Sequence, residues 1–214
     1  MSGRQTKEHI FDEAVRLFSE QGYAATTIRQ IASAVKVNVA TIYIYFQNKE
    51  GIFDEILSLF ENKLVRYNPT SIHIKPRRER DGPQKYLSRL LWNYVIEDDL
   101  FMRRAFCIVC MEQYTSKKAR ALVRETLHDE VTENLRRALE ELVERGEIPG
   151  FDTYSFALLW SRVLYSSAML AAHGDSPEEK NNLRAANELM LDMAVSGKIP
   201  EAVNCVGAVN SRVP

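Results

Sequence analysis

The sequence predicts an all-helical protein. Apolar residues recur at spacings of three and four along most of the chain, and this is the period of amphipathic helices. Glycines, prolines and acidic clusters interrupt the pattern at intervals that suit helix ends. Helical spacing covers residues 6–21, 26–35, 50–66, 84–97, 99–115, 119–145, 152–173 and 177–196.

Composition is that of an ordinary globular protein. The chain has 214 residues, of which 45% are hydrophobic and 27% charged, and its formal net charge is -1. No apolar run approaches the roughly 18 residues that cross a bilayer, and the first ten residues lack the apolar core of a signal peptide. We therefore expect a cytoplasmic protein that does not contact membranes. Any basic surface for nucleic acid has to be local.

Residues 39–53, VATIYIYFQNKEGIF, pose a conflict between strand and helix. Their β-branched and aromatic side chains favour a strand. The neighbouring sequence offers no second strand, however, and a lone strand leaves its backbone groups unpaired. Asn38 is a suitable N-cap, and Ile42 and Phe46 are spaced to share one buried face. We therefore predict a helix that leaves four side chains largely outside: Thr41, Tyr43, Ile44 and Tyr45.

A loop interrupts the helical pattern at residues 67–83, which contain three prolines and the basic run KPRRER at 75–80. This composition is typical of a long loop or linker, and it marks a natural boundary in the chain. The basic run is either a solvated loop or a contact to DNA phosphates. Assigned by motif, the predicted domains are a helix-turn-helix domain at 1–50 and a helical domain at 51–214.

Two short helices joined by a tight turn indicate a helix-turn-helix, whose second helix enters the major groove of DNA. Residues 10–53 resemble the N-terminal DNA-binding domain of the TetR family of transcriptional regulators. The residues that carry the resemblance are Ala14, Leu17, Phe18, Gly22, Thr26, Thr27, Ile31, Ala32, Val37, Thr41, Tyr43, Phe46, Lys49 and Glu50.

The resemblance implies roles in DNA binding. Thr27 and Arg29 would contact phosphates or a base, and the helix start would face base edges through Asn38, Val39, Ala40 and Thr41. Tyr43, Tyr45 and Lys49 would contact phosphates. Lys36 stands where the family usually has glycine, and a left-handed lysine costs about 1 kcal/mol, so either the turn relaxes or packing absorbs that cost. Val39 and Ile44 replace residues that are commonly polar or basic, so apolar contact to thymine methyl groups is one substitute for hydrogen bonds.

The resemblance also implies that the second domain binds a small-molecule effector and forms a homodimer. Residues 152–173 are apolar nearly all round, so every side of this helix needs a cover. Together with residues 183–194 they suit a four-helix interface between two subunits, and a monomeric core is the alternative. Candidate ligand-binding residues suit a mostly apolar effector, although each also fits an ordinary core: Tyr94, Phe106, Cys110, Met111, Tyr114, His128, Trp160 and Tyr165.

Catalytic signatures are not evident. No Ser/His/Asp set, phosphate loop or paired carboxylates stand out, so we expect no catalytic residues, metal or cofactor, and an enzyme is a distant alternative. Cys107 and Cys110 form a CxxC within an apolar helix and are expected to be small buried hydrophobes rather than a redox pair or half of a zinc site.

The function that these patterns imply is a homodimeric DNA-binding regulator, a repressor that an effector releases from a pseudo-palindromic operator. Its half-sites would lie about 10 bp apart, or a multiple of that. A protein-interaction module that has kept the fold but lost operator binding remains open.

Overall fold

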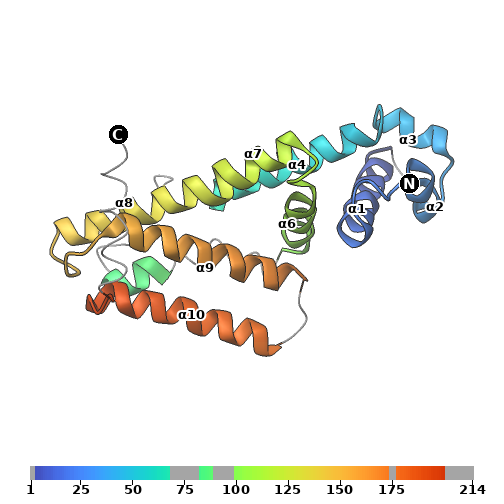
Figure 1. Ribbon diagram of the computed structural model, residues 1–214. Coiled ribbons are helices and arrows are strands. Elements are labelled where there is room, and N and C mark those ends of the chain that lie inside the picture. The colour runs from blue at the N-terminus through green and yellow to red at the C-terminus, as the bar shows by residue number, and fades with distance from the viewer. Residues whose placement is uncertain (1–2, 68–81, 89–98, 174–176, 201–214) are drawn as a thin grey trace. The chain divides into compact units, whose positions relative to one another are not determined.

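The computed structural model describes residues 3–67, 82–88, 99–173 and 177–200, and these contain helices and no strands. The predicted all-α fold is confirmed. The helices are α1 (Gly3–Gln21), α2 (Ile28–Val35), α3 (Val39–Tyr45), α4 (Lys49–Tyr67), α6 (Leu100–Glu112), α7 (Lys117–Leu122), the π-helix η2 (Val123–Glu130), α8 (Val131–Glu144), α9 (Thr153–His173) and α10 (Pro177–Ser196) (Figure 1). Residues 82–88 are also helical. The basic run at 75–80 lies outside the described residues.

Packing divides the chain into two units. The first unit contains Met1–Lys63 and Asp98–Val123, and the second contains Leu64–Glu97 and Arg124–Pro214. The first unit therefore joins α6 and α7 to the N-terminal helices. The predicted domains at 1–50 and 51–214 divide the chain by function, and that division stays a prediction.

The first unit is built on α1, which packs against both α2 and α6, while α2 packs against α3. The apolar stripe expected on the first helix is largely buried, as are most of the apolar residues at helical spacing in α2 and α4, although Leu59 of α4 is 38% exposed. Fully buried side chains include Ile10, Phe18, Ile31, Ile42, Ile52, Ile56 and Phe60. This core holds two very short helices, α2 and α3, which would be unstable in isolation.

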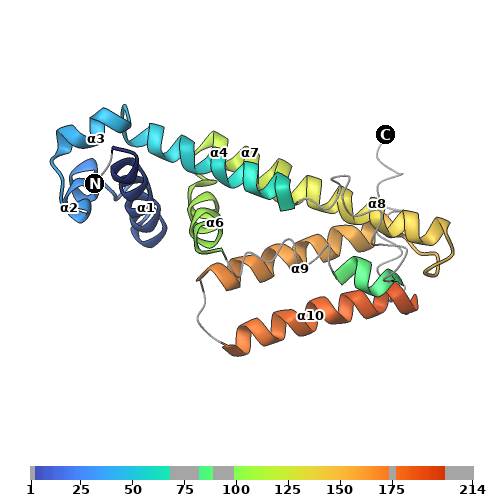
Figure 2. The same ribbon diagram turned by 180° about the vertical axis from the view of Figure 1, so that it is seen from behind.

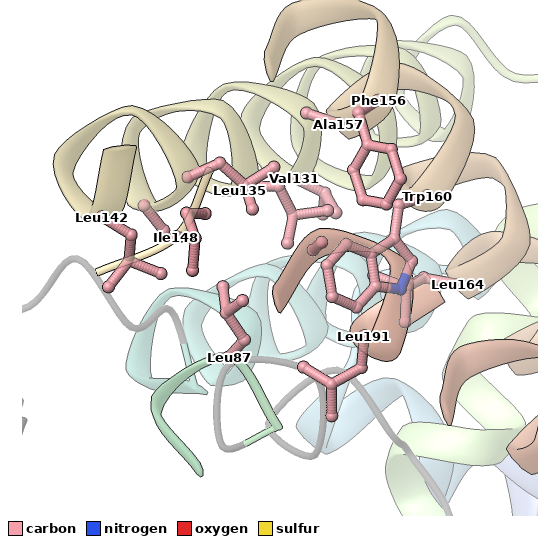
Figure 3. Close-up of a cluster of buried hydrophobic side chains, with 13 residues drawn as sticks. Leu87, Val131, Leu135, Leu142, Ile148, Phe156, Ala157, Trp160, Leu164 and Leu191 are labelled. Atoms are coloured by element: carbon pink, nitrogen blue, oxygen red, sulfur yellow. The ribbon is translucent and has the colours of Figure 1, made fainter. Parts of the chain in front are cut away.

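The second unit is a layer of three long helices in which α9 packs against both α8 and α10, as both ribbon views show (Figure 2). Figure 3 shows the core between them, where Phe156 and Trp160 of α9 lie among leucines of the neighbouring helices. The Phe156 and Trp160 rings meet edge to face with centroids 5.7 Å apart. Leu87 from the segment 82–88 belongs to the same cluster.

The segment Val123–Glu130 differs from expectation. We predicted one continuous helix over 119–145, but η2 separates α7 from α8 with i→i+5 hydrogen bonding. π-Helical segments are rare insertions within α-helices, so the helical pattern of the flanking turns predicts one continuous α-helix. Among the described residues, no helix is long and apolar enough to cross a membrane.

Candidate nucleic-acid interface

Helix α2 begins with a reciprocal pair of hydrogen bonds. The Thr27 hydroxyl accepts from the Gln30 backbone N–H at 3.2 Å, and the Gln30 side chain accepts from the Thr27 N–H at 2.7 Å. This capping box satisfies two backbone donors that the helix itself leaves unpaired. It fixes α2 with Ile31 and Val35 buried and with Arg29 exposed.

The turn between α2 and α3 keeps the backbone that the family resemblance implies, although lysine replaces glycine. Lys36 is left-handed, with φ +60° and ψ +41°. Its N–H bonds to the Ser33 carbonyl at 3.1 Å, and the Val37 N–H bonds to the Ala32 carbonyl at 3.0 Å. These are the two bonds of a Schellman motif, so the turn does not relax, and packing of the flanking helices absorbs the strain at Lys36.

Helix α3 has the predicted cap and the predicted buried face. The Asn38 side-chain oxygen accepts from the Thr41 N–H at 2.9 Å and from the Thr41 hydroxyl at 3.1 Å. Ile42 and Phe46 are buried, and they hold the seven-residue helix to the domain. The helix assignment over the strand-like residues is confirmed.

The outward side of α2 and α3 is a continuous set of predicted contact residues. Exposed are Thr27, Arg29, Lys36, Asn38, Ala40, Tyr43 and Ile44, while Val39, Thr41 and Tyr45 are half-buried. Neither Arg29 nor Lys36 forms an ion pair with any residue that the structure describes. Tyr45 lies against the start of α1, because a Cβ added at Gly3 would stand 3.3 Å from the Tyr45 hydroxyl oxygen.

Lys49, a predicted phosphate contact, bonds to backbone groups within the first unit. Its ammonium donates to the carbonyls of Tyr23 and Thr26, both at 2.7 Å, and lies 4.2 Å from the centroid of the Tyr23 ring. Burial lowers the pKa of Lys49, and the charge of Glu112 opposes that shift. A phosphate contact from Lys49 would compete with these bonds, and that contact stays a prediction.

Glu112 at the end of α6 contacts the turn between α1 and α2, a role that the sequence did not reveal. Its carboxylate accepts from the Tyr23 N–H at 3.2 Å and from the Thr115 hydroxyl at 2.7 Å, and the residue is only 9% exposed. Burial, with the nearby charges of Glu50, Asp54 and Glu112, raises the pKa of Tyr23. A carboxylate 89 residues away along the chain leaves no local signal, except that a lone glutamate within an apolar helix needs a partner.

Two further ion pairs join α4 to the helices that follow it within the first unit. Lys63 pairs with Asp99, the N-cap of α6, and this lowers the pKa of Asp99 against the effect of its burial. Lys118 of α7 pairs with Asp54 at 2.7 Å. Helix α6 is thus connected to the N-terminal helices at both of its ends.

The candidate ligand-binding residues fall in both units of the chain. In the first unit Phe106 and Cys110 are buried, whereas Met111 is exposed and Tyr114 is 78% exposed, and their roles in ligand binding stay predictions. Tyr94 lies outside the described residues. Cys107 and Cys110 are buried thiols, and burial raises the pKa of Cys107, as expected for small hydrophobes.

In the second unit two candidate residues meet. The rings of His128 and Tyr165 lie 4.4 Å apart, and His128 Nδ1 accepts from the Arg162 guanidinium at 2.7 Å. Burial and the charge of Arg162 lower the pKa of His128. Trp160, in contrast, is fully buried within the core, where its indole N–H donates to Asn187 at 3.4 Å. Among the described residues no three metal-ligating side chains gather.

Comparison with known proteins identifies the same segment as the sequence motif. Residues 10–56 match the family model described as "Bacterial regulatory proteins, tetR family". The regulator AcrR of Shigella flexneri is 41% identical over 61 residues, which are 28% of each chain, and the match to YttP of Bacillus subtilis covers 27% of that protein. The chain thus aligns with only about a quarter of the length of these two relatives.

Longer but weaker matches extend beyond this segment. The repressor NicS of Pseudomonas putida is 26% identical over 156 residues, which cover 68% of this chain and 65% of NicS. The crystal structure of the TetR family regulator PfmR from Thermus thermophilus is 26% identical, with a TM-score of 0.62, over 85% of this chain and 93% of PfmR. The matched motif, these relatives and the shared fold together support a regulator of the tetR family of bacterial regulatory proteins.

Proposed function

We propose that the protein is a DNA-binding transcriptional regulator, and specifically a repressor that binds its operator as a homodimer. One observation carries this proposal. The capped helices α2 and α3 present exposed side chains around a tight turn, including the two cations Arg29 and Lys36, which pair with no described residue. Such cations suit phosphate contacts, and the exposed side of α3 has the size and position of a recognition helix.

Operator binding is tested by measuring affinity for the DNA upstream of the protein's own gene at several salt concentrations. A regulator should bind one segment far more tightly than unrelated DNA. The logarithm of its association constant should fall linearly with the logarithm of the salt concentration. The double variant Arg29→Ala with Lys36→Ala should weaken binding and reduce that slope by about 2, since it removes two phosphate contacts. The matched control Lys198→Ala with Arg124→Ala removes two exposed cations from the second unit, and it should change neither quantity.

If the protein is instead an interaction module that has lost operator binding, it should prefer no DNA segment, and the two double variants should behave alike. An enzyme is not favoured, because the relatives are named regulators.

The dimer is proposed from the surface of the second unit. Leu159 and Leu170 of α9 and Leu189 of α10 are exposed leucines, although other residues of both helices fill a core. Exposed leucines on adjacent long helices suit a four-helix interface with a second copy. The variant Leu159→Glu with Leu189→Glu should sediment as a monomer, while the control Leu100→Glu, at an exposed leucine of α6, should remain a dimer.

Release by a small, mostly apolar effector is proposed from the connections of α6. A ligand that favours one position of α6 would act on the N-terminal helices through Glu112, at Tyr23, and through the Lys63–Asp99 pair. Such a ligand changes operator affinity only by the ratio of its affinities for the two conformations. Screening apolar compounds for release of a labelled operator tests this, and Glu112→Ala should reduce the release by any compound that is found.

A further inference from the structure

The exposed face of α3 is apolar. Ala40, Tyr43 and Ile44 stand at positions i, i+3 and i+4 and therefore share one side of the helix. Tyr43 is 52% exposed and Ile44 is 75% exposed. Among the large hydrophobic residues that the structure describes, only Tyr114 is more exposed than Ile44.

Polar groups on this helix are few, and its cap residue Asn38 and Thr41 already bond to each other. The helix VATIYIY carries no charged residue. The Asn38 side-chain oxygen accepts two hydrogen bonds from Thr41, so the Thr41 hydroxyl proton and that oxygen are both in use. The Tyr45 hydroxyl lies near Gly3 at the start of α1. What the helix offers to a base edge is therefore mainly the aliphatic surface of Ala40 and Ile44 beside the Tyr43 ring.

Major-groove chemistry limits what this surface can recognise. Base edges there carry hydrogen-bond donors, acceptors and one apolar group, the C5-methyl of thymine. An isoleucine placed against a donor or acceptor would remove water from it without replacing the hydrogen bond. Against a thymine methyl group the same side chain gains apolar burial.

We propose that Ile44, together with Ala40, reads thymine through its C5-methyl group, so that A·T pairs occupy the operator positions facing α3. This inference rests on the proposed DNA-binding function and names the base class that the site selects. Ile44 acts as a specificity-determining residue, while Arg29 and Lys36 supply affinity that does not depend on sequence.

The test uses duplexes selected from a random library by the full-length protein, with thymines then replaced one at a time by deoxyuridine. This replacement removes only the methyl group and keeps every hydrogen-bonding group. Burying one methyl group is worth roughly a fourfold change in affinity. We expect losses of about that size at one or two thymines in each half-site, and no loss at thymines elsewhere.

Variants of the protein test the same contact from the protein side. Ile44→Ala should bind the thymine duplex more weakly and should no longer distinguish it from the deoxyuridine duplex. Leu100→Ala, at another exposed aliphatic residue of the first unit, should retain the full thymine preference. Because Ile44 is exposed, its truncation should leave the thermal unfolding temperature unchanged, and this shows that the variant is folded.

Each outcome is informative. If no sequence is selected, the proposed function fails. If a sequence is selected but deoxyuridine binds as well as thymine, or Ile44→Ala keeps the discrimination, DNA binding stands and thymine readout by Ile44 is wrong. If Ile44 instead docks another protein, Ile44→Ala will leave DNA affinity unchanged, and this result also contradicts the inference.

Discussion

The two turns of the helix-turn-helix region both use a left-handed residue, Gly22 with φ +85° before α2 and Lys36 with φ +60° before α3, yet they are held differently. Side chains from α4 and α6 bond to the first turn, where Lys49 and Glu112 pair three backbone groups. The second turn is closed by backbone bonds from its own residues. The first turn is thus where the rest of the protein acts on this region, and the second is left open for a partner.

Removing Lys49 should have the largest effect on this contrast. Lys49→Met keeps the apolar stem but leaves the carbonyls of Tyr23 and Thr26 without their donor, and bonds from charged donors are worth about 1.5–3 kcal/mol each. We expect the free energy of unfolding to fall by about 2–4 kcal/mol in urea titrations followed by circular dichroism. Lys36→Met is the matched control at the second turn, and it should change stability by less than about 0.5 kcal/mol. Equal losses in the two variants would contradict the contrast.

Removing the charge of Glu112 should have a smaller effect. Glu112→Gln keeps one acceptor oxygen but weakens the bond to the Tyr23 N–H and loses the attraction to Lys49, so we expect a loss of about 1–2 kcal/mol. Hydrogen exchange at the Tyr23 amide should become faster, while exchange at the Val37 amide in the second turn should not change. Glu147→Gln, at an exposed carboxylate of the second unit, is the control.

Alkaline pH should weaken the first turn in particular. The pKa of Tyr23 is raised above its ordinary value of 10.0, chiefly by burial. The unfolded chain therefore loses this proton first, and the contribution of Tyr23 to stability is present below pH 10 and is lost as the pH rises through the folded-state pKa. Wild type should lose more stability between about pH 9 and pH 11 than Tyr23→Phe does. If the stability of the two proteins falls in parallel with pH, Tyr23 does not contribute to the loss of stability at alkaline pH.

Removing the backbone strain at Lys36 should change the free energy of unfolding least, and this change should be an increase. Lys36→Gly removes the left-handed strain and adds some unfolded-state entropy, so a net gain of about 0.5 kcal/mol is expected. Lys36→Ala also removes the charge but keeps the strain, and it should give no gain in thermal unfolding temperature. A stabilisation of the same size in both variants would mean that the charge, rather than the backbone, is unfavourable at this position.

Local features of this region were predictable because they depend on neighbours in sequence. The Asn38 cap and the spacing of Ile42 and Phe46 outweigh the strand preference of the intervening side chains, and the structure confirms that helix. The left-handed Lys36 followed from the family turn.

Features that depend on contacts between distant segments were not predicted. The carbonyl partners of Lys49 belong to a turn 23 and 26 residues earlier, which no spacing rule identifies. The contact of Glu112 with Tyr23 spans 89 residues. The π-helical segment between α7 and α8 was not predicted because such segments are rare insertions within α-helices.

Ile44 adds no charge to the surface that we propose to face the major groove. Salt weakens DNA binding in proportion to the number of phosphates that protein cations neutralise, and an apolar contact with a base leaves that number unchanged. Binding to the operator and binding to random DNA should therefore weaken in parallel as ionic strength rises. The ratio of the two affinities, which sets how many competing genomic sites the operator can outweigh, would then remain nearly constant when the salt concentration changes.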